Sequence, residues 1–424
     1  MDALKIKQAS AMPAPTWGWL RMNDTAIEIP AGLERARAVT IEADEDLTET
    51  HASFEGAVEK LQERLDAVRA DAPDTRACVR AAEREQELLD DLDTPALSAY
   101  QLAATREEIA GDVAHAFETG IGIDARSYLN FLAGGTVVLA TEEGACEQAI
   151  VRVAGTSGHM AGAAVDVVAA KGSTLDVVIS LDGVADSSRA AGLIGSELRV
   201  FAGENARVNV TVYITADDVF TVLDDAGYVL DEGARVNVRH VVLGGAHTYT
   251  GLASDLRGDT ARMEIDTRYL AAGDDTRDFN YIIRHRGRRT FSNMDANGVL
   301  TGTSKKVLRG TIDLIHGCKG AEGSERETVL LANKGVDNKT VPVILCDEDD
   351  VAGNHGATIG HVRPEQLFYL GCRGLSQEQA EALFTAAKLE DAALSAPDEQ
   401  IRANVIRLGS ALIEDFADFE EEIA

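Results

Sequence analysis

A five-residue pattern recurs at a nearly fixed interval in the middle of this 424-residue chain. Ala206–Val210 reads Ala-Arg-Val-Asn-Val, Ala234–Val238 repeats it, and Ala261–Ile265 repeats it more loosely as Ala-Arg-Met-Glu-Ile. The copies begin at positions 206, 234 and 261, which gives intervals of 28 and 27 residues. A fixed period of roughly 20 to 50 residues is typical of stacked repeats. Because the LxxLxL spacing of leucine-rich repeats is missing, the pattern favours a parallel β-solenoid.

Side chains alternate between the two faces of a strand, so each copy is expected to point Ala, Val and Val inward and Arg and Asn outward. Strict register between coils would then stack Arg207, Arg235 and Arg262 about 4.8 Å apart, where like charges repel. Either neighbouring acids neutralise these arginines or the register drifts from coil to coil. A meandering β-sandwich is the alternative architecture for the same strands.

Three regions of the chain differ in composition and in the spacing of their apolar residues. Residues 1–120 contain apolar residues at helical spacing, most clearly over 54–68, and predict an N-terminal helical region. Residues 121–363 are rich in Gly and in short Val/Ile/Leu runs, which predicts the β-solenoid core. Residues 364–424 predict a C-terminal helical region that includes a capping box at 376–379. The chain is therefore expected to be mainly β, with helical regions on both sides of the core.

Composition excludes several classes of function. The chain has 71 Asp and Glu residues against 40 Lys and Arg, a formal net charge of -31, which disfavours binding to nucleic acid or to an anionic membrane. Five widely spaced Cys residues form neither a disulfide framework nor a CxxC zinc motif. The N-terminus lacks the apolar segment of a signal peptide, and we expect a cytoplasmic protein.

Few motifs indicate chemistry. P-loop, G-x-S-x-G, H-E-x-x-H and G-x-G-x-x-G motifs are absent, which disfavours common hydrolases, zinc proteases and dehydrogenases. His355 is flanked by small residues, so its imidazole is a candidate iron ligand, although a hydrogen bond to a neighbouring turn is the simpler role. Cys346 ends an apolar run and is more typical of a core side chain. The basic stretch 284–289 either binds an anionic partner or is neutralised by the chain's own acids.

A set of motifs between residues 278 and 375 resembles the SufB/SufD family of the SUF iron–sulfur cluster assembly system. The motifs are Asp278-Phe279-Asn280-Tyr281, Ser292-Asn293-Met294, Leu308-Arg309-Gly310-Thr311-Ile312-Asp313, Asn338-Lys339-Thr340-Val341-Pro342, His355-Gly356-Ala357-Thr358-Ile359-Gly360 and Leu367-Phe368-Tyr369-Leu370 followed by Arg373-Gly374-Leu375. The N-terminal segment Thr16-Trp17-Gly18-Trp19-Leu20-Arg21-Met22-Asn23 is similar to the start of SufD sequences.

Within this family the chain is more similar to SufD than to SufB. SufB has an assembly cysteine at about the position of Pro342 and a glutamate at about Gly356, and this chain has neither. The histidine of the SufD motif falls on His355, whereas a cysteine that many SufD sequences have two residues earlier is replaced by Gly353. Cys346, earlier on the same segment, is a weaker candidate for a thiol contribution.

The resemblance implies a right-handed parallel β-helix in a non-enzymatic scaffold subunit. It implies a heterodimer with SufB through the β-helix and binding of the SufC ATPase by the C-terminal helical region. The candidates for SufC docking are Leu367, Phe368, Tyr369 and Arg373, with capping of the open end of the β-helix as their alternative role. No permanently bound cofactor is expected, only a transient iron–sulfur cluster at the SufB interface, with His355 facing the SufB cysteine.

Two alternatives remain at this point. The family also allows a homodimeric scaffold that acts with SufC alone, although the missing SufB-type residues weaken this interpretation. A carbohydrate-active β-helix enzyme is a third possibility. Such enzymes usually carry a signal peptide and aromatic sugar platforms, whereas aromatic residues are only 5% of this chain.

Overall fold

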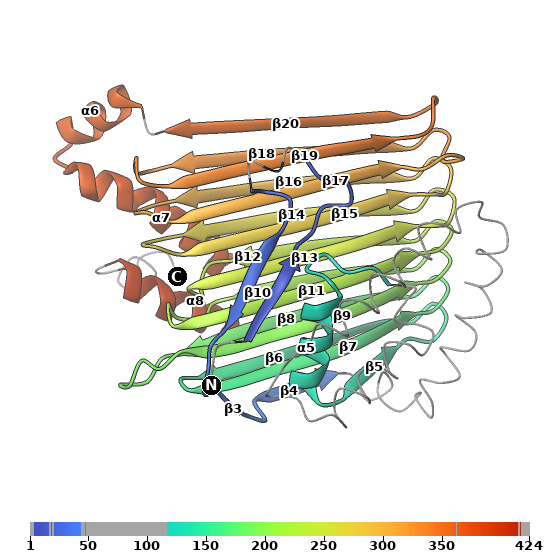
Figure 1. Ribbon diagram of the computed structural model, residues 1–424, viewed down its shortest axis with the longest axis horizontal. Helices are drawn as coiled ribbons and strands as arrows, with labels where there is room; N and C mark the ends of the chain where they lie inside the picture. The colour runs from blue at the N-terminus through green and yellow to red at the C-terminus, as the bar shows by residue number, and fades with distance from the viewer. Residues whose placement is uncertain are drawn as a thin grey trace.

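The parallel β-solenoid predicted from the repeat is the centre of the computed structural model (Figure 1). The structure describes residues 4–16, 18, 21–43, 47, 117–361, 363–413 and 416. The strands of the solenoid are β5 (Thr136–Ala140), β6 (Cys146–Thr156), β7 (His159–Ala169), β8 (Thr174–Val184), β9 (Gly192–Ala202), β10 (Arg207–Ile214), β11 (Phe220–Leu230), β12 (Arg235–Val242), β13 (His247–Leu256), β14 (Arg262–Ala271), β15 (Thr276–His285), β16 (Phe291–Leu300), β17 (Lys305–Leu314), β18 (Glu322–Leu331), β19 (Asp337–Cys346) and β20 (Ala352–His361).

Successive strands belong to two different sheets, so each coil contributes one strand to each sheet. The even sheet has the order β20-β18-β16-β14-β12-β10-β8-β6-β4, and the odd sheet has the order β19-β17-β15-β13-β11-β9-β7-β3, with β5 also paired to β7. The short strands β3 (Glu34–Arg35) and β4 (Val39–Ala43) lie at the N-terminal ends of these sheets. Apolar side chains from both inner faces fill the space between the sheets. The sandwich alternative is therefore wrong, since neighbouring strands from β6 to β20 are parallel.

The repeated pentapeptides keep strict register. Arg207 is the Cα partner of Arg235, which is the partner of Arg262, so the expected stacking of like charges does occur. All three arginines are exposed, where water and salt screen their repulsion. Arg262 also lies over the ring of Phe291, 5.6 Å from its centroid. Two positions along, Asn237 donates a side-chain hydrogen bond to Asn209 (2.8 Å), which helps to hold the same register.

The N-terminal segment covers the outer face of the odd sheet. It contains β1 (Leu4–Ala9) and β2 (Thr25–Ile29), which form an antiparallel pair and pack with α5 (Ile123–Ala133) against that sheet. The described part of residues 1–120 thus contains the four short strands β1 to β4, while the predicted helical periodicity at 54–68 lies outside the described residues. Helix α5 lies within the range predicted for the β core. Its apolar side packs against β7 and β9 of the odd sheet.

The described part of the C-terminal region is helical, as predicted, and contains α6 (Pro364–Cys372), α7 (Gln377–Leu394) and α8 (Glu399–Leu412). Ser376 caps α7 in the predicted capping box. Helices α7 and α8 pack on the outer face of the even sheet through an apolar cluster. Helix α6, which carries the candidate docking residues, buries none of its side chains, so the structure does not show these residues packed on the end of the solenoid. Among the described helices, none is both long and apolar enough to span a bilayer.

A buried ionic cluster fixes α5 to the odd sheet. Arg126 of α5 contacts Asp225 of β11 (3.2 Å) and Glu197 of β9 (3.1 Å), and all three side chains are almost completely buried. Asp225 also accepts hydrogen bonds from the backbone N–H groups of Gly120 and Ile121, both 3.1 Å long. The Asp225 carboxylate therefore links β11 both to α5 and to the segment that precedes α5.

We expect Asp225→Ala to lower the free energy of unfolding by about 3 kcal/mol, because it removes one of the two carboxylates that pair with the buried Arg126 guanidinium and leaves two buried backbone donors without their acceptor. The control is Asp218→Ala, which removes an exposed ion pair with Arg189 and should change stability by less than about 1 kcal/mol. Urea denaturation of the three proteins measures the difference. Similar losses of stability in Asp225→Ala and Asp218→Ala would contradict the structural role of the Asp225 carboxylate.

Candidate functional site

The C-terminal end of the solenoid is open. β19 and β20 are the last strands of the odd and even sheets, and among the described residues no further strand pairs with them. Figure 1 shows β20 as the outermost strand of the stack, with α6 beyond the end of that strand. Unpaired backbone N–H and C=O groups at a sheet edge readily accept a strand from another chain. This edge, together with the interior that it leaves uncovered, is the open end.

His355 lies in β20 at the open end. It is the Cα partner of Glu325, whose buried side chain points between the two sheets, so His355 occupies an inward-facing position. No coil covers it, and it is exposed despite this orientation. The imidazole is therefore available to a partner that closes the end of the solenoid.

Cys346, the second candidate, ends β19 on the same coil. It is the Cα partner of the buried Leu314, so its position also faces inward, and it is exposed. Its thiol donates to the backbone carbonyl of Glu348 (3.2 Å), within the turn that leads to β20. His355 and Cys346 thus share the last coil, but the thiol is engaged in the turn.

A polar network lies one coil below the open end. The ammonium of Lys306 donates to Glu327 (2.5 Å) and to the hydroxyl of Thr340 (3.2 Å), and Tyr269 donates to the same carboxylate (2.9 Å). Lys306 and Glu327 are fully buried. Burial lowers the pKa of Lys306, and the neighbouring Glu327 opposes this effect. The network satisfies the charge of Lys306 entirely within the protein.

Glu325 lies beside this network without joining it. Only 6% of the residue is exposed, and among the described residues its carboxylate has no hydrogen-bond or ion-pair partner. Burial first, and then the nearby Glu327, raise its pKa to about 7. The carboxylate lies against Gly310 of the opposite sheet, where a Cβ atom would meet it at 2.4 Å. A glycine at position 310 therefore leaves the space that the carboxylate occupies.

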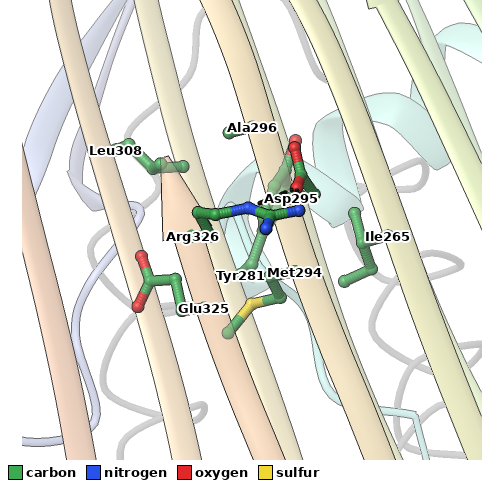
Figure 2. Close-up of a pocket in the computed structure, with 8 residues that line it drawn as sticks. All are labelled: Ile265, Tyr281, Met294, Asp295, Ala296, Leu308, Glu325 and Arg326. Atoms are coloured by element: carbon green, nitrogen blue, oxygen red, sulfur yellow. Dashed lines mark hydrogen bonds and ion pairs between the residues drawn. The ribbon is translucent and has the colours of Figure 1, made fainter. Parts of the chain in front are cut away.

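The surroundings of Glu325 are mostly apolar. Tyr281, Met294 and Leu308 line, with Glu325, a cavity of about 10 Å³, room for roughly one water molecule. Figure 2 shows Glu325 directed away from the ion pair between Asp295 and Arg326, which lies on the outer face. That pair consequently does not neutralise Glu325.

Deeper in the solenoid, a second cluster of polar side chains is buried. Tyr281 contacts the ring nitrogen of His240 (3.2 Å) and the hydroxyl of Thr267 (3.0 Å), and Asp224 lies 3.6 Å from the other ring nitrogen of His240. Burial lowers the pKa of His240 to about 3 and raises that of Asp224 to about 7. His240 is thus a neutral core histidine at physiological pH.

The proposed docking residues lie together on α6, which buries none of its side chains. Phe368 is 74% exposed and Tyr369 55% exposed. Arg373 donates to the Tyr369 hydroxyl (2.7 Å) and its guanidinium lies over the same ring. Leu367 is half-buried. The helix therefore presents an aromatic pair to solvent at a distance from the apolar contacts of α7 and α8.

The basic stretch 284–289 is largely neutralised by acids of the same chain. Arg284 pairs with Glu118 (2.8 Å), Arg286 with Asp255 (2.9 Å) and Arg288 with Asp259 (2.8 Å). Of the two possibilities raised by the sequence, the structure favours internal neutralisation.

Sequence reasoning missed Glu325 and the Lys306–Glu327 pair. The run Ser-Glu-Arg-Glu-Thr at 324–328 has the composition of a solvated strand, and only register reveals which of its charges point inward. Glu325 and His355 lie 30 positions apart, whereas the repeat in the sequence is 27 or 28 residues, so extending that repeat would have missed their pairing by two or three positions. Among the described residues, no three metal-ligating side chains converge.

Comparison with known proteins matches residues 151–388 to a family model described as "SUF system FeS cluster assembly, SufBD core domain". Over 208 residues the chain is 26% identical to the iron–sulfur cluster assembly protein SufD of Bacillus subtilis, covering 49% of this chain and 48% of that protein. It is 25% identical over 185 residues to SufD of Escherichia coli, covering 43% and 44% respectively. A SufBD family protein of Mycobacterium tuberculosis is 30% identical over 144 residues, covering 34% of this chain and 17% of that protein. The alignments thus span half or less of each relative, and the family match includes the open end and α6.

We expect Glu325→Gln to change the pH dependence of stability. The pKa of Glu325 in the folded state, about 7, lies above its ordinary value of 4.5, so the folded state binds an extra proton between these values. The stability gained by this protonation is present below pH 4.5 and is lost as pH rises through 7. The Glu327, Lys306, Tyr281 and His355 side chains that face the same space remain in the variant.

Relative to the parent, Glu325→Gln should therefore gain stability between pH 5 and pH 8, by up to about 3 kcal/mol. Chemical denaturation at the two pH values measures this gain. Glu322→Gln, an exposed change on the same strand, is the control and should show none. Parallel pH profiles for Glu325→Gln and its parent would contradict the burial of an unpaired carboxyl.

Proposed function

This chain belongs to the SufBD core family of the SUF system for FeS cluster assembly, and we propose that within it the chain acts as a SufD-type scaffold subunit. In this role it has no catalytic turnover of its own. It pairs with SufB, binds the SufC ATPase and contributes to the site where a transient iron–sulfur cluster is assembled. The cluster is the cargo of the complex and not a resident cofactor.

The proposal rests above all on the open end. The two edge strands β19 and β20 have no described neighbour beyond them, and a strand added by a partner would satisfy their unpaired backbone groups. Covering this end would also bury the inward-facing positions of the last coil. His355 would then lie in a two-chain interface, where a neutral imidazole can ligate iron or accept a proton.

A SufD-type role is supported by the motif that contains His355 and by the relatives that are named SufD. The positions where SufB has its assembly cysteine and glutamate are Pro342 and Gly356 in this chain. Because neither side chain can supply a thiolate or a carboxylate, the partner has to supply the main sulfur ligand. A homodimer formed through the same open end is the alternative arrangement.

The SufC contact is proposed to be α6. An exposed aromatic pair next to an arginine is typical of the centre of a protein–protein interface, since Tyr and Arg are enriched among residues that dominate binding energy. The α6 residues pack little against the rest of the chain, so they are free to fit a partner.

We expect His355→Ala to reduce the cluster content of a complex co-expressed with SufB and SufC by about tenfold or more. An exposed side chain contributes little to the core, so the complex should still assemble. The measurement is iron and acid-labile sulfide per complex. The control is His316→Ala, which removes another exposed histidine from the turn between β17 and β18.

A parental cluster content in His355→Ala would remove this residue from the site. A stable dimer of this chain that loads a cluster with SufC in the absence of SufB would instead support the homodimer.

We expect the double substitution Phe368→Ala and Tyr369→Ala to weaken SufC binding by about 2 kcal/mol or more, a roughly thirtyfold higher Kd. The melting temperature should not change, because α6 buries no side chain. Calorimetric titration with SufC measures the Kd. Leu412→Ala, which removes an exposed apolar side chain from α8, is the control. Parental affinity in the double variant would move the SufC contact away from α6.

A further inference from the structure

Glu325 is difficult to explain as a structural residue. A buried carboxyl that has no partner costs stability, and most buried charged groups are paired or hydrogen-bonded. Other buried acids near it illustrate the rule: Glu327 accepts from Lys306 and Tyr269, and Asp278 pairs with Arg309 (2.7 Å). Glu325 has no such partner among the described residues. A carboxylate in this condition marks a candidate site for a ligand that the folded chain does not itself supply.

The position of Glu325 relates it to His355. The two residues are Cα partners on adjacent parallel strands, about 4.8 Å apart, and their side chains point to the same side. Glu325 lies one coil inside, and His355 lies on the uncovered coil. Across the interior, Gly310 provides space for the carboxylate, and Pro342, the Cα partner of Gly310, belongs to the uncovered coil. A small ligand that enters the open end beside His355 therefore meets Glu325 beneath it.

We propose that Glu325 and His355 are the two protein donors of a divalent-cation half-site at the open end, with the remaining positions filled by water or by the partner chain. This inference rests on the proposed function, in which His355 faces the iron cargo. It adds a second donor on a different strand and gives the buried carboxylate a purpose.

The choice of a cation follows from the charges around Glu325. Lys306 is a nearby buried cation that opposes the rise in the pKa of Glu325, but two of its three N–H donors go to Glu327 and Thr340, and it forms no ion pair with Glu325. Tyr281, Met294 and Leu308 border the same cavity and carry no charge, and Arg326, which also borders it, pairs with Asp295 on the outer face. A carboxylate oxygen together with an imidazole nitrogen suits borderline divalent metals such as ferrous iron and cobalt. Two donors make an incomplete site, in agreement with the absence of a three-ligand cluster among the described residues.

The test is anaerobic titration of the full-length chain with Co²⁺, followed by its d–d absorption, and with Fe²⁺, followed by equilibrium dialysis. Glu325→Gln keeps the size of the side chain, and we expect it to weaken Co²⁺ binding about tenfold or more. His355→Ala should do the same. Glu322→Gln, an exposed change on the same strand, is the matched control and should bind as the parent does. If Glu325→Gln fails to fold, Glu325→Asp, which retracts the carboxylate, supplies the second variant and should also weaken binding.

Parental Co²⁺ affinity in a folded Glu325→Gln variant would overturn the half-site, and so would equal losses in Glu325→Gln and Glu322→Gln. These results are separate from the test of the proposed function, which measures cluster content in the complex. If His355→Ala lowers the cluster content while Glu325→Gln binds Co²⁺ normally, only the half-site fails. If Co²⁺ binding depends on both residues while His355→Ala keeps its cluster, the proposed role of His355 in cluster assembly fails and the half-site stands.

Discussion

Backbone hydrogen bonding between coils is the constraint on which the rest of this structure depends. The N–H and C=O groups of each strand are satisfied by the equivalent strand one coil away, and strict register carries this pairing from β6 to β20. Short strands border the stack at its N-terminal end, whereas β19 and β20 have no described neighbour beyond them. Among the described residues the outer edge of the last coil is unpaired, and a strand from another chain would complete its hydrogen bonding. The proposed scaffold role uses this unpaired edge.

The same register organises the interior. Near the N-terminal end, the inward positions of β7 are alanine and valine, whereas β17 and β18 place lysine and glutamate between the sheets. Most of these charges are satisfied within the protein, as in the Lys306–Glu327 pair. Glu325 differs from them, and it lies directly beneath the exposed imidazole of His355. The unpaired charge thus occurs where the stack is open, which is where a ligand from outside could neutralise it.

Parts of this arrangement could be predicted from the sequence, and the reasons differ by element. The solenoid was accessible because β10, β12 and β14 begin with nearly the same pentapeptide. The strands β1 and β2 were missed although Thr25–Ile29 alternates in polarity, since two short strands give little periodic signal. His355 was found through a motif. Its relation to Glu325 was not, because coil lengths vary and the pairing of distant strands is set by the whole stack. The exposure of α6 could not be predicted either, since the sequence of an apolar helix face does not reveal whether the rest of the chain covers it.

Hydrogen–deuterium exchange of the isolated chain and of its complex with SufB tests the central claim most directly. The account predicts that amides of β19 and β20 exchange rapidly in the isolated chain and become protected in the complex, while strands in the middle of the stack, such as β10 and β12, change little. Protection confined to the outer faces of the sheets, with β19 and β20 exchanging equally fast in both samples, would contradict it.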